Sequence, residues 1–104
     1  MTQHPDVHND SAQSRYELKT ADGMAIAEYR SVGTHAVMFT HTEVPESMEG
    51  QGVGSRLVRA ALDDVKAQGK RVIPMCPFVA SYISEHHEYL DLVDPVQRGA
   101  LNIT

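Results

Sequence analysis

The fold is decided by the stretch Glu49-Gly50-Gln51-Gly52-Val53-Gly54-Ser55-Arg56, in which glycine occupies every second position from 50 to 54. Closely spaced glycines let a backbone turn tightly and bring its N–H groups near a ligand. Beyond them, apolar residues recur at helical spacing, at Val53, Leu57, Val58, Ala61, Leu62 and Val65. A helix start offers N–H groups without intrahelical acceptors and a positive dipole end. The stretch therefore predicts a phosphate or pyrophosphate site, and a flexible glycine hinge is the alternative interpretation.

Three strands are predicted before this loop. Residues 15–20 alternate polar and apolar side chains, which is the two-residue period of a half-buried strand. Ala21-Asp22-Gly23 then supplies a turn, because its Asp-Gly pair favours positive φ. Residues 24–30 and 35–42 follow as partner strands, with a second turn over 31–33. We expect the three strands to form an antiparallel meander.

A parallel pair is predicted after the loop. Gly69 stands where the C-cap glycine of the long helix belongs, and residues 70–76 are a short strand. Residues 77–86 are predicted to form a second helix that begins at Pro77. Proline is tolerated there because the N–H at the first helical position has no intrahelical acceptor. The strand over 35–42, the long helix and the strand over 70–76 form a βαβ unit, whose strands should be parallel. The fold class is therefore α+β, with a mixed sheet of about four strands and two main helices.

The chain has 104 residues, which fits one domain. Residues 1–14 are polar, and we expect a disordered N-terminal tail there. The patterned domain covers 15–93. Residues 94–104 contain Pro95 and Gly99 and show no sustained period, so they are expected to form a C-terminal tail.

Composition and charge exclude several classes of function. The chain is 41% hydrophobic and 22% charged, as in ordinary globular proteins, and its net charge is −5. An acidic chain argues against non-specific nucleic-acid binding, although Arg56/Arg59 and Lys70/Arg71 are candidate basic groups for a small anionic cofactor. No apolar run is long enough for a membrane span, and no apolar signal segment opens the chain. With one cysteine and no internal disulfide, we expect a cytoplasmic protein.

Two familiar phosphate-binding motifs do not fit the glycine loop. A P-loop ends in Gly-Lys-Ser/Thr, whereas this loop ends in Gly54-Ser55-Arg56 without a lysine. A Rossmann fingerprint needs a third glycine where Ser55 stands, and it follows its strand directly. Here Pro45 and its neighbours separate the loop from the preceding strand. Both interpretations are therefore rejected.

The segment from Gly50 to Leu57 instead resembles the acyl-CoA-binding motif of the GNAT acetyltransferases, in which Gln/Arg-x-x-Gly-x-Gly/Ala opens a helix. In that superfamily the loop amides hold the pyrophosphate of coenzyme A. The resemblance implies acetyl-CoA or coenzyme A as the cofactor, with contacts from Gly50, Gln51, Gly52, Val53, Gly54, Ser55 and Arg56. Glu49 occupies the family's Gln or Arg position, so the resemblance implies backbone contacts rather than a phosphate contact from that side chain.

Further stretches resemble one branch of the family, the minimal GNAT-like proteins with a short N-acetyltransferase domain. They are residues 39–45, 49–58, 76–83 and 87–89, and the resemblance covers nearly all of 15–93. It implies additional cofactor contacts from Thr42, Val44, Pro77, Phe78 and Ser81.

Cys76 is the first candidate for the chemistry. It ends a predicted strand at the start of the helix over 77–86, where the helix dipole favours a thiolate. In the family the pantetheine arm runs between the two parallel strands, and Cys76 lies at the mouth of that gap. Cys76 is therefore a candidate nucleophile or substrate-facing group. The alternative is a small buried hydrophobic residue.

Three other residues are candidates for proton transfer or for holding the cofactor arm. His41 ends the third predicted strand, opposite Cys76 across the parallel pair, and histidine is a natural base near neutral pH. It would otherwise be a half-exposed histidine without a chemical task. Tyr82 or Ser81 could donate to the leaving thiolate or to the CoA arm. Tyr82 is equally consistent with the core, because it shares a predicted helix face with Phe78.

No metal is expected. His86 and His87 are adjacent, and neighbouring side chains diverge on a helix. The leading hypothesis is thus an acetyl-CoA-dependent N-acetyltransferase acting on an amine of a small molecule or a protein, as a monomer or weak homodimer. The alternative is a non-catalytic CoA or acyl-CoA binding or sensor module, which the short segment after residue 93 favours. An interaction domain with an idle glycine loop is the third possibility.

Overall fold

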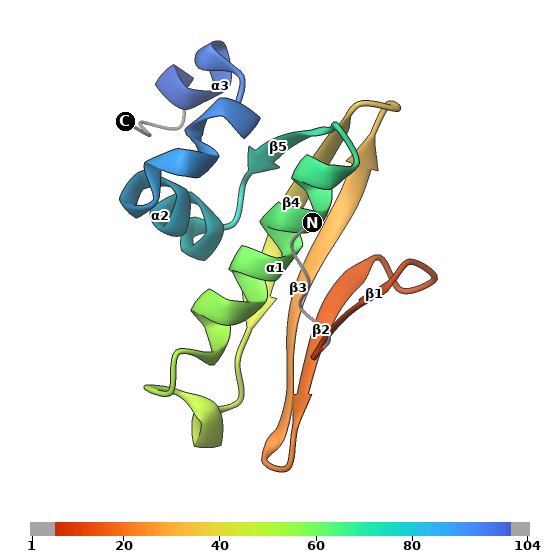
Figure 1. The fold of residues 1–104 in the computed structure, drawn as a ribbon, viewed down its shortest axis with the longest axis vertical. Coiled ribbons are helices and arrows are strands. Elements are labelled where there is room, and N and C mark those ends of the chain that lie inside the picture. Colours follow the sequence, from red (N-terminus) through yellow and green to blue (C-terminus); the bar gives the residue numbers. More distant parts are fainter. Residues whose placement is uncertain (1–5, 101–104) are drawn as a thin grey trace.

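The structure is a computed structural model that describes residues 6–100, and one mixed sheet is its frame (Figure 1). The strands lie in chain order: β1 (Val7–Asp10), β2 (Arg15–Thr20), β3 (Gly23–Val32), β4 (Ala36–Glu43) and β5 (Arg71–Pro74). β1 to β4 pair antiparallel, and β5 pairs parallel with β4. The α+β class, the antiparallel meander and the parallel pair are therefore confirmed, with one strand more than expected.

The additional strand, β1, corrects the prediction of a disordered tail over 1–14. β1 pairs antiparallel with β2, and Val7 packs against the core. Tyr29 on β3 donates its hydroxyl to Asn9 Oδ1 at 2.7 Å. Val7 and Asn9 are the two residues of β1 that face the core, and two positions are too few to show the alternation of a strand. Asn9 is also polar, and it is held there by the hydrogen bond from Tyr29. Residues 1–5 lie outside the described part of the chain.

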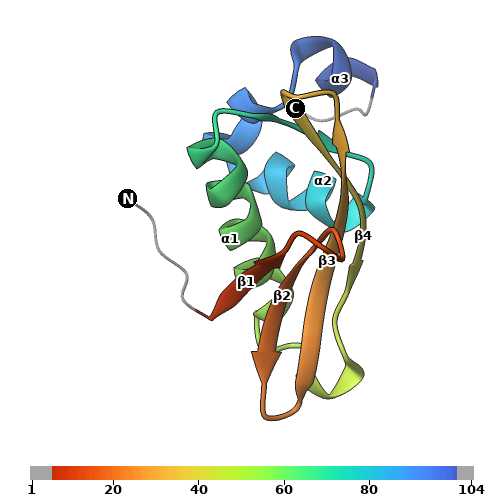
Figure 2. The same cartoon turned by 90° about the vertical axis from the view of Figure 1, so that its right-hand side faces the viewer.

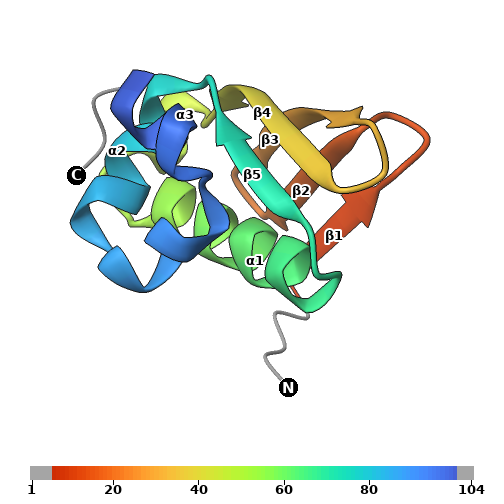
Figure 3. The ribbon, with the colours of Figure 1, turned by 90° about the horizontal axis from the view of Figure 1, so that it is seen from above.

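The helices cover one face of the sheet and leave the other open, as Figures 2 and 3 show from two sides. They are η1 (Glu46–Met48), α1 (Val53–Ala67), α2 (Pro77–Glu85), η2 (His87–Leu92) and α3 (Pro95–Ala100). α3 corrects the expectation of a C-terminal tail over 94–104, and it begins at a proline, which is tolerated at a first helical position. Residues 101–104 lie outside the described part. Over residues 6–100, no helix combines the length and the apolar character that crossing a membrane requires.

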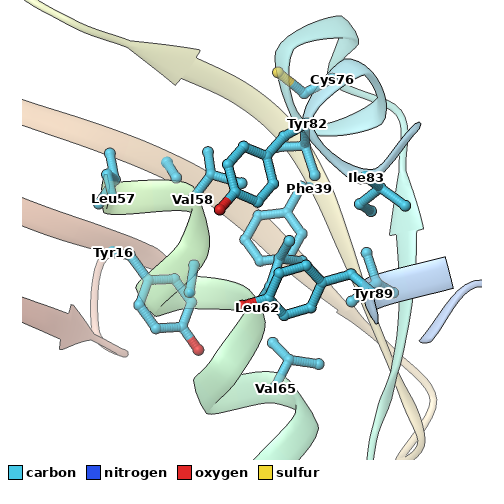
Figure 4. Packing of buried hydrophobic residues seen from close by; sticks show 14 of the residues in the cluster. Tyr16, Phe39, Leu57, Val58, Leu62, Val65, Cys76, Tyr82, Ile83 and Tyr89 are labelled. Atoms are coloured by element: carbon cyan, nitrogen blue, oxygen red, sulfur yellow. The ribbon is translucent and has the colours of Figure 1, made fainter. Parts of the chain in front are cut away.

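The core forms between α1, α2 and the inner face of the sheet (Figure 4). α1 contributes the apolar stripe that the sequence predicts, including Leu57, Leu62 and Val65. The expected core face of α2 is partly wrong. Val79 is buried there in addition to Tyr82 and Ile83, whereas Phe78 is 43% exposed, because the first turn of α2 aims Phe78 toward the start of α1.

A β-bulge on β4 sets which side chains face the helices. Two neighbouring residues of β3 pair with His41 and Phe39, so Thr40 between them is an extra residue. A bulge shifts the alternation of side chains by one position. Thr42 therefore lies on the same face as Phe39, toward the helices, whereas His41 lies on the open face and is exposed.

β5 forms one edge of the sheet and ends in Pro74, which has no N–H for a further strand. Directly after it, the N–H of Met75 bonds the carbonyl of Ile73 at 3.1 Å. The N–H of Cys76 then bonds the carbonyl of Phe39 at 2.9 Å. Beyond this bond β4 continues, whereas the segment that follows β5 turns into α2. β4 and α2 therefore separate on the side where the glycine loop lies (Figure 1).

Tyr16 joins the sheet to α1, and its removal gives a first testable prediction. Its hydroxyl donates to Asp64 Oδ2 at 2.6 Å, and burial, followed by this hydrogen bond, raises the pKa of Tyr16 far above its usual range. The folded state therefore keeps a proton that the unfolded chain loses above pH about 10, and stability should fall as the pH rises past that value. We expect Tyr16→Phe to cost about 1 kcal/mol at neutral pH and to flatten this alkaline loss.

Urea unfolding from pH 7 to 11 measures both effects. Tyr29→Phe is the matched control, because it removes a tyrosine hydroxyl whose acceptor, Asn9, is uncharged. An alkaline loss of stability in Tyr16→Phe equal to that of the unmodified chain would contradict the prediction.

Candidate functional site

The glycine loop meets α1 in the arrangement that the sequence predicts. Gly52 is the N-cap and has a φ of 74°, in the left-handed region that favours glycine. Its carbonyl accepts the N–H of Arg56 at 3.0 Å. Among the described residues, no acceptor bonds the N–H groups of Val53, Gly54 and Ser55. These groups and the helix dipole form a positive surface that suits a phosphate.

Gly54 packs closely against Phe78, so that a side chain at position 54 would have to displace the ring of Phe78. A Cβ at this position would lie 2.8 Å from Phe78 Cζ and 3.3 Å from Val44 Cγ2, and the first distance is shorter than real contacts allow. The aromatic ring of α2 therefore rests directly on the start of α1, beside the end of β4.

A pocket of about 380 Å³ opens between the loop, the end of β4 and α2. It is lined by residues predicted to contact the cofactor: Thr42, Val44, Gly50, Gly52, Val53, Gly54, Ser55 and Phe78. Met48 and Glu49 also line it. The sequence analysis placed Glu49 in the loop without a side-chain contact and did not select Met48. Their position directly before the glycines is the sequence feature that could have indicated this contact. In the structure η1 turns the chain there and buries Met48.

Four other predicted contact residues are not part of the pocket lining. Gln51 donates its amide to the carbonyl of Ser47 at 3.2 Å. Arg56 forms an ion pair with Asp6, just before β1. Pro77 and Ser81 are exposed on α2. The structure thus gathers the glycines and their apolar neighbours but directs Arg56 elsewhere.

Cys76 lies at the position that the sequence predicts, as the N-cap residue of α2. It is only 4% exposed, and its Sγ lies 3.3 Å from Thr42 Oγ1. The thiol is thus both a core residue and a neighbour of the pocket, separated from it by the side chain of Thr42.

His41 does not lie opposite Cys76, which corrects the expected placement. The bulge at Thr40 turns His41 to the open face, where its side chain is 53% exposed and its Nε2 lies 3.2 Å from Glu43 Oε2. A bulge of one residue is not visible in the sequence, so the strand position alone did not reveal the face on which His41 lies. The exposure agrees with the alternative of a half-exposed histidine.

Tyr82 belongs to the core, the second of the two roles considered for it. Its hydroxyl accepts a hydrogen bond from Arg59 Nε at 3.1 Å, and its ring stacks on His86 at 3.9 Å. Burial raises the pKa of Tyr82, and the positive charge of Arg59 partly opposes this shift. Figure 4 shows its hydroxyl and the sulfur of Cys76 pointing in different directions.

Arg59 also connects α1 to η2, a network that the sequence analysis missed. Its guanidinium donates to Glu88 Oε2 at 3.3 Å and lies 6.0 Å from the ring centre of Tyr89. The hydroxyl of Tyr89 donates to Asp63 Oδ1 at 2.7 Å, and burial, with this bond, raises the pKa of Tyr89. Arg59 therefore stabilises the packing of α2 and η2 on α1 and is not directed at the loop.

No group of three or more His, Cys, Asp or Glu side chains suited to a metal ion occurs in residues 6–100. His86, one of the histidines considered for such a site, holds its Nδ1 2.8 Å from the carbonyl of Tyr82.

Comparisons with known proteins agree with this geometry. The sequence profile described as GCN5-related N-acetyl-transferase matches residues 15–92, which is most of the chain. The chain belongs to the GCN5-related N-acetyltransferase family. Curated relatives include Protein NATD1 of Mus musculus, 33% identical over 93 residues, which cover 86% of this chain and 84% of the relative. Protein NATD1 of Danio rerio is 26% identical over 91 residues, with coverage of 84% and 83%.

A solved structure shares the fold of this GCN5-related chain. It is the NMR solution structure of a GCN5-like protein from Staphylococcus aureus, with a TM-score of 0.66 and 20% identity. The match covers 88% of this chain and 91% of that one. The minimal GNAT-like assignment made from the sequence is therefore confirmed for the family and for the fold.

Proposed function

We propose that the chain is an acetyl-CoA-dependent N-acetyltransferase. The observation that carries the proposal is the continuity of one pocket, which begins at the free N–H groups of α1 and passes Val44 to reach Thr42, the neighbour of Cys76. The pyrophosphate of coenzyme A would lie on the amides of residues 50–56. Its pantetheine arm would follow the end of β4, where Phe78 and Val44 offer apolar contacts.

Two routes of transfer fit this placement. In the direct route, an uncharged amine attacks the thioester carbonyl, the carbon–sulfur bond to coenzyme A breaks, and the thiolate takes up the proton that the amine loses. In the covalent route, the Cys76 thiolate attacks first, which gives acetyl-Cys76 and a CoA thiolate. The uncharged amine then attacks acetyl-Cys76, the carbon–sulfur bond to Cys76 breaks and restores its thiolate, and the CoA thiolate takes up the proton that the amine loses. The acceptor would be an amine of a small molecule or of a protein.

The other predicted catalytic residues receive narrower roles. His41 could act only as a base for an amine that approaches from the open face of the sheet, because its side chain lies there. Tyr82 is proposed as a packing residue, since Arg59 already donates to its hydroxyl. We further propose a cytoplasmic protein that is a monomer or a weak homodimer.

The second candidate function is a non-catalytic CoA or acyl-CoA binding or sensor module. It is favoured by the burial of Cys76 and by the absence, among the described residues, of any contact from His41 or Tyr82 to the thiol. Both candidates require the same cofactor site, so they differ in acetyl transfer alone.

Calorimetric titration with coenzyme A and acetyl-CoA, followed by intact-mass measurement after incubation with acetyl-CoA, tests the proposal. We expect both ligands to bind, and the mass to increase by one acetyl group if the covalent route operates. Binding without an adduct and without transfer to any of a panel of amines would favour the sensor module. No binding of either ligand would contradict both candidates.

A further inference from the structure

Thr42 is the side chain that connects the pocket to the thiol. It lines the pocket, and its Oγ1 lies 3.3 Å from Cys76 Sγ. It reaches this position because the bulge at Thr40 turns it from the open face toward the helices. A threonine in a strand also has few side-chain rotamers, so its hydroxyl is held in place before any ligand arrives.

We propose that Thr42 is a positioning residue for Cys76, whose hydroxyl donates a hydrogen bond to the sulfur and thereby favours the thiolate. This inference rests on the proposed role of Cys76 in transfer. The neutral thiol can donate its own proton to Thr42 Oγ1. Once that proton has passed to water, only the hydroxyl of Thr42 can donate, so the contact strengthens in the charged form.

Besides the dipole of α2, Thr42 is the hydrogen-bonding side chain that the described structure brings to the thiol. Cys76 makes no side-chain capping bond to α2, and Pro77 after it has no N–H to offer. Two basic side chains on the neighbouring elements have partners of their own. His41 pairs with Glu43 on the open face, and Arg59, which is partly exposed, bonds the hydroxyl of Tyr82.

Alkylation by iodoacetamide tests the inference without any cofactor, because Cys76 is the chain's single cysteine. The rate is measured against pH and normalised to its high-pH plateau, so that altered access to the buried thiol changes the plateau and not the profile. We expect Thr42→Val, which keeps the shape of the side chain, to move the profile up by about one pH unit, a roughly ten-fold slower reaction near neutral pH. Thr42→Ser should restore the profile of the unmodified chain.

Thr40→Val is the matched control, since it makes the same change two residues away on the same strand, where the hydroxyl lies 3.4 Å from the carbonyl of Glu28. Its profile should equal that of the unmodified chain. If Thr42→Val does not fold, Thr42→Ala replaces it. A profile that stays in place in the folded variant, or that Thr42→Ser fails to restore, overturns the inference. Because alkylation needs no acetyl-CoA, a failure of the proposed function leaves this result interpretable.

Discussion

Gly52→Asp is expected to weaken CoA binding by about 100-fold or more while the domain remains folded. The new carboxylate would stand at the N-cap of α1 and would accept the N–H groups that the pyrophosphate needs. It would also place a negative charge beside the phosphates, which near a protein surface costs about 4 kcal/mol at 4 Å. The left-handed backbone of Gly52 is one that aspartate tolerates better than most residues, so the fold should survive. Calorimetric titration measures the affinity, and circular dichroism verifies the fold.

Gly52→Asn is the control for this charge. Asparagine has nearly the same shape as aspartate and tolerates the same backbone conformation, but it carries no charge. We expect it to bind coenzyme A much more tightly than Gly52→Asp does. Equal affinities of the two variants would show that no anion binds at the N-terminus of α1.

Cys76→Ala is expected to abolish the acetyl adduct in the covalent route while CoA binding persists. The substitution removes the chain's one thiol, and the pocket lining does not include Cys76. Intact mass after incubation with acetyl-CoA measures the adduct, and calorimetry verifies that the ligand still binds. The small cavity left in the core should cost about 1 kcal/mol, which thermal unfolding measures.

Cys76→Ser keeps a hydroxyl beside Thr42 and serves as the matched variant. We expect it to form little or no adduct, because a serine hydroxyl without a base is a weak nucleophile. An adduct of undiminished size in Cys76→Ala would place the acetyl group on another residue. Unchanged turnover of an amine by Cys76→Ala would establish the direct route.

Much of the fold could be predicted because its signals are local. The spacing of apolar residues from Val53 predicted α1, and the glycines before it predicted the loop geometry. Pro77 marked the start of α2, and the alternation over 15–20 gave β2 with its exact bounds. Each of these signals lies within one element, where periodicity or a special residue is sufficient.

The remaining features depend on contacts between distant residues. Asn9 in β1 is polar in the sequence, and only its bond to Tyr29 explains why it faces the core side of the sheet. The bulge at Thr40 exists only in the pairing with β3, yet it decides that Thr42 and not His41 meets Cys76. The sequence around Arg59 indicates only a surface cation, because its bonds to Tyr82 and Glu88 join residues that are far apart in the sequence. The structure therefore brings many of the predicted residues together around the glycines, whereas His41 and Tyr82 lie away from the thiol.

The proline at the end of β5 also bears on how copies of this protein behave at high concentration. Fibrils grow when an unpaired strand templates a fresh backbone onto its margin. At this margin Pro74 offers no amide. Pro74 therefore interrupts the pairing of a further strand at the end of β5.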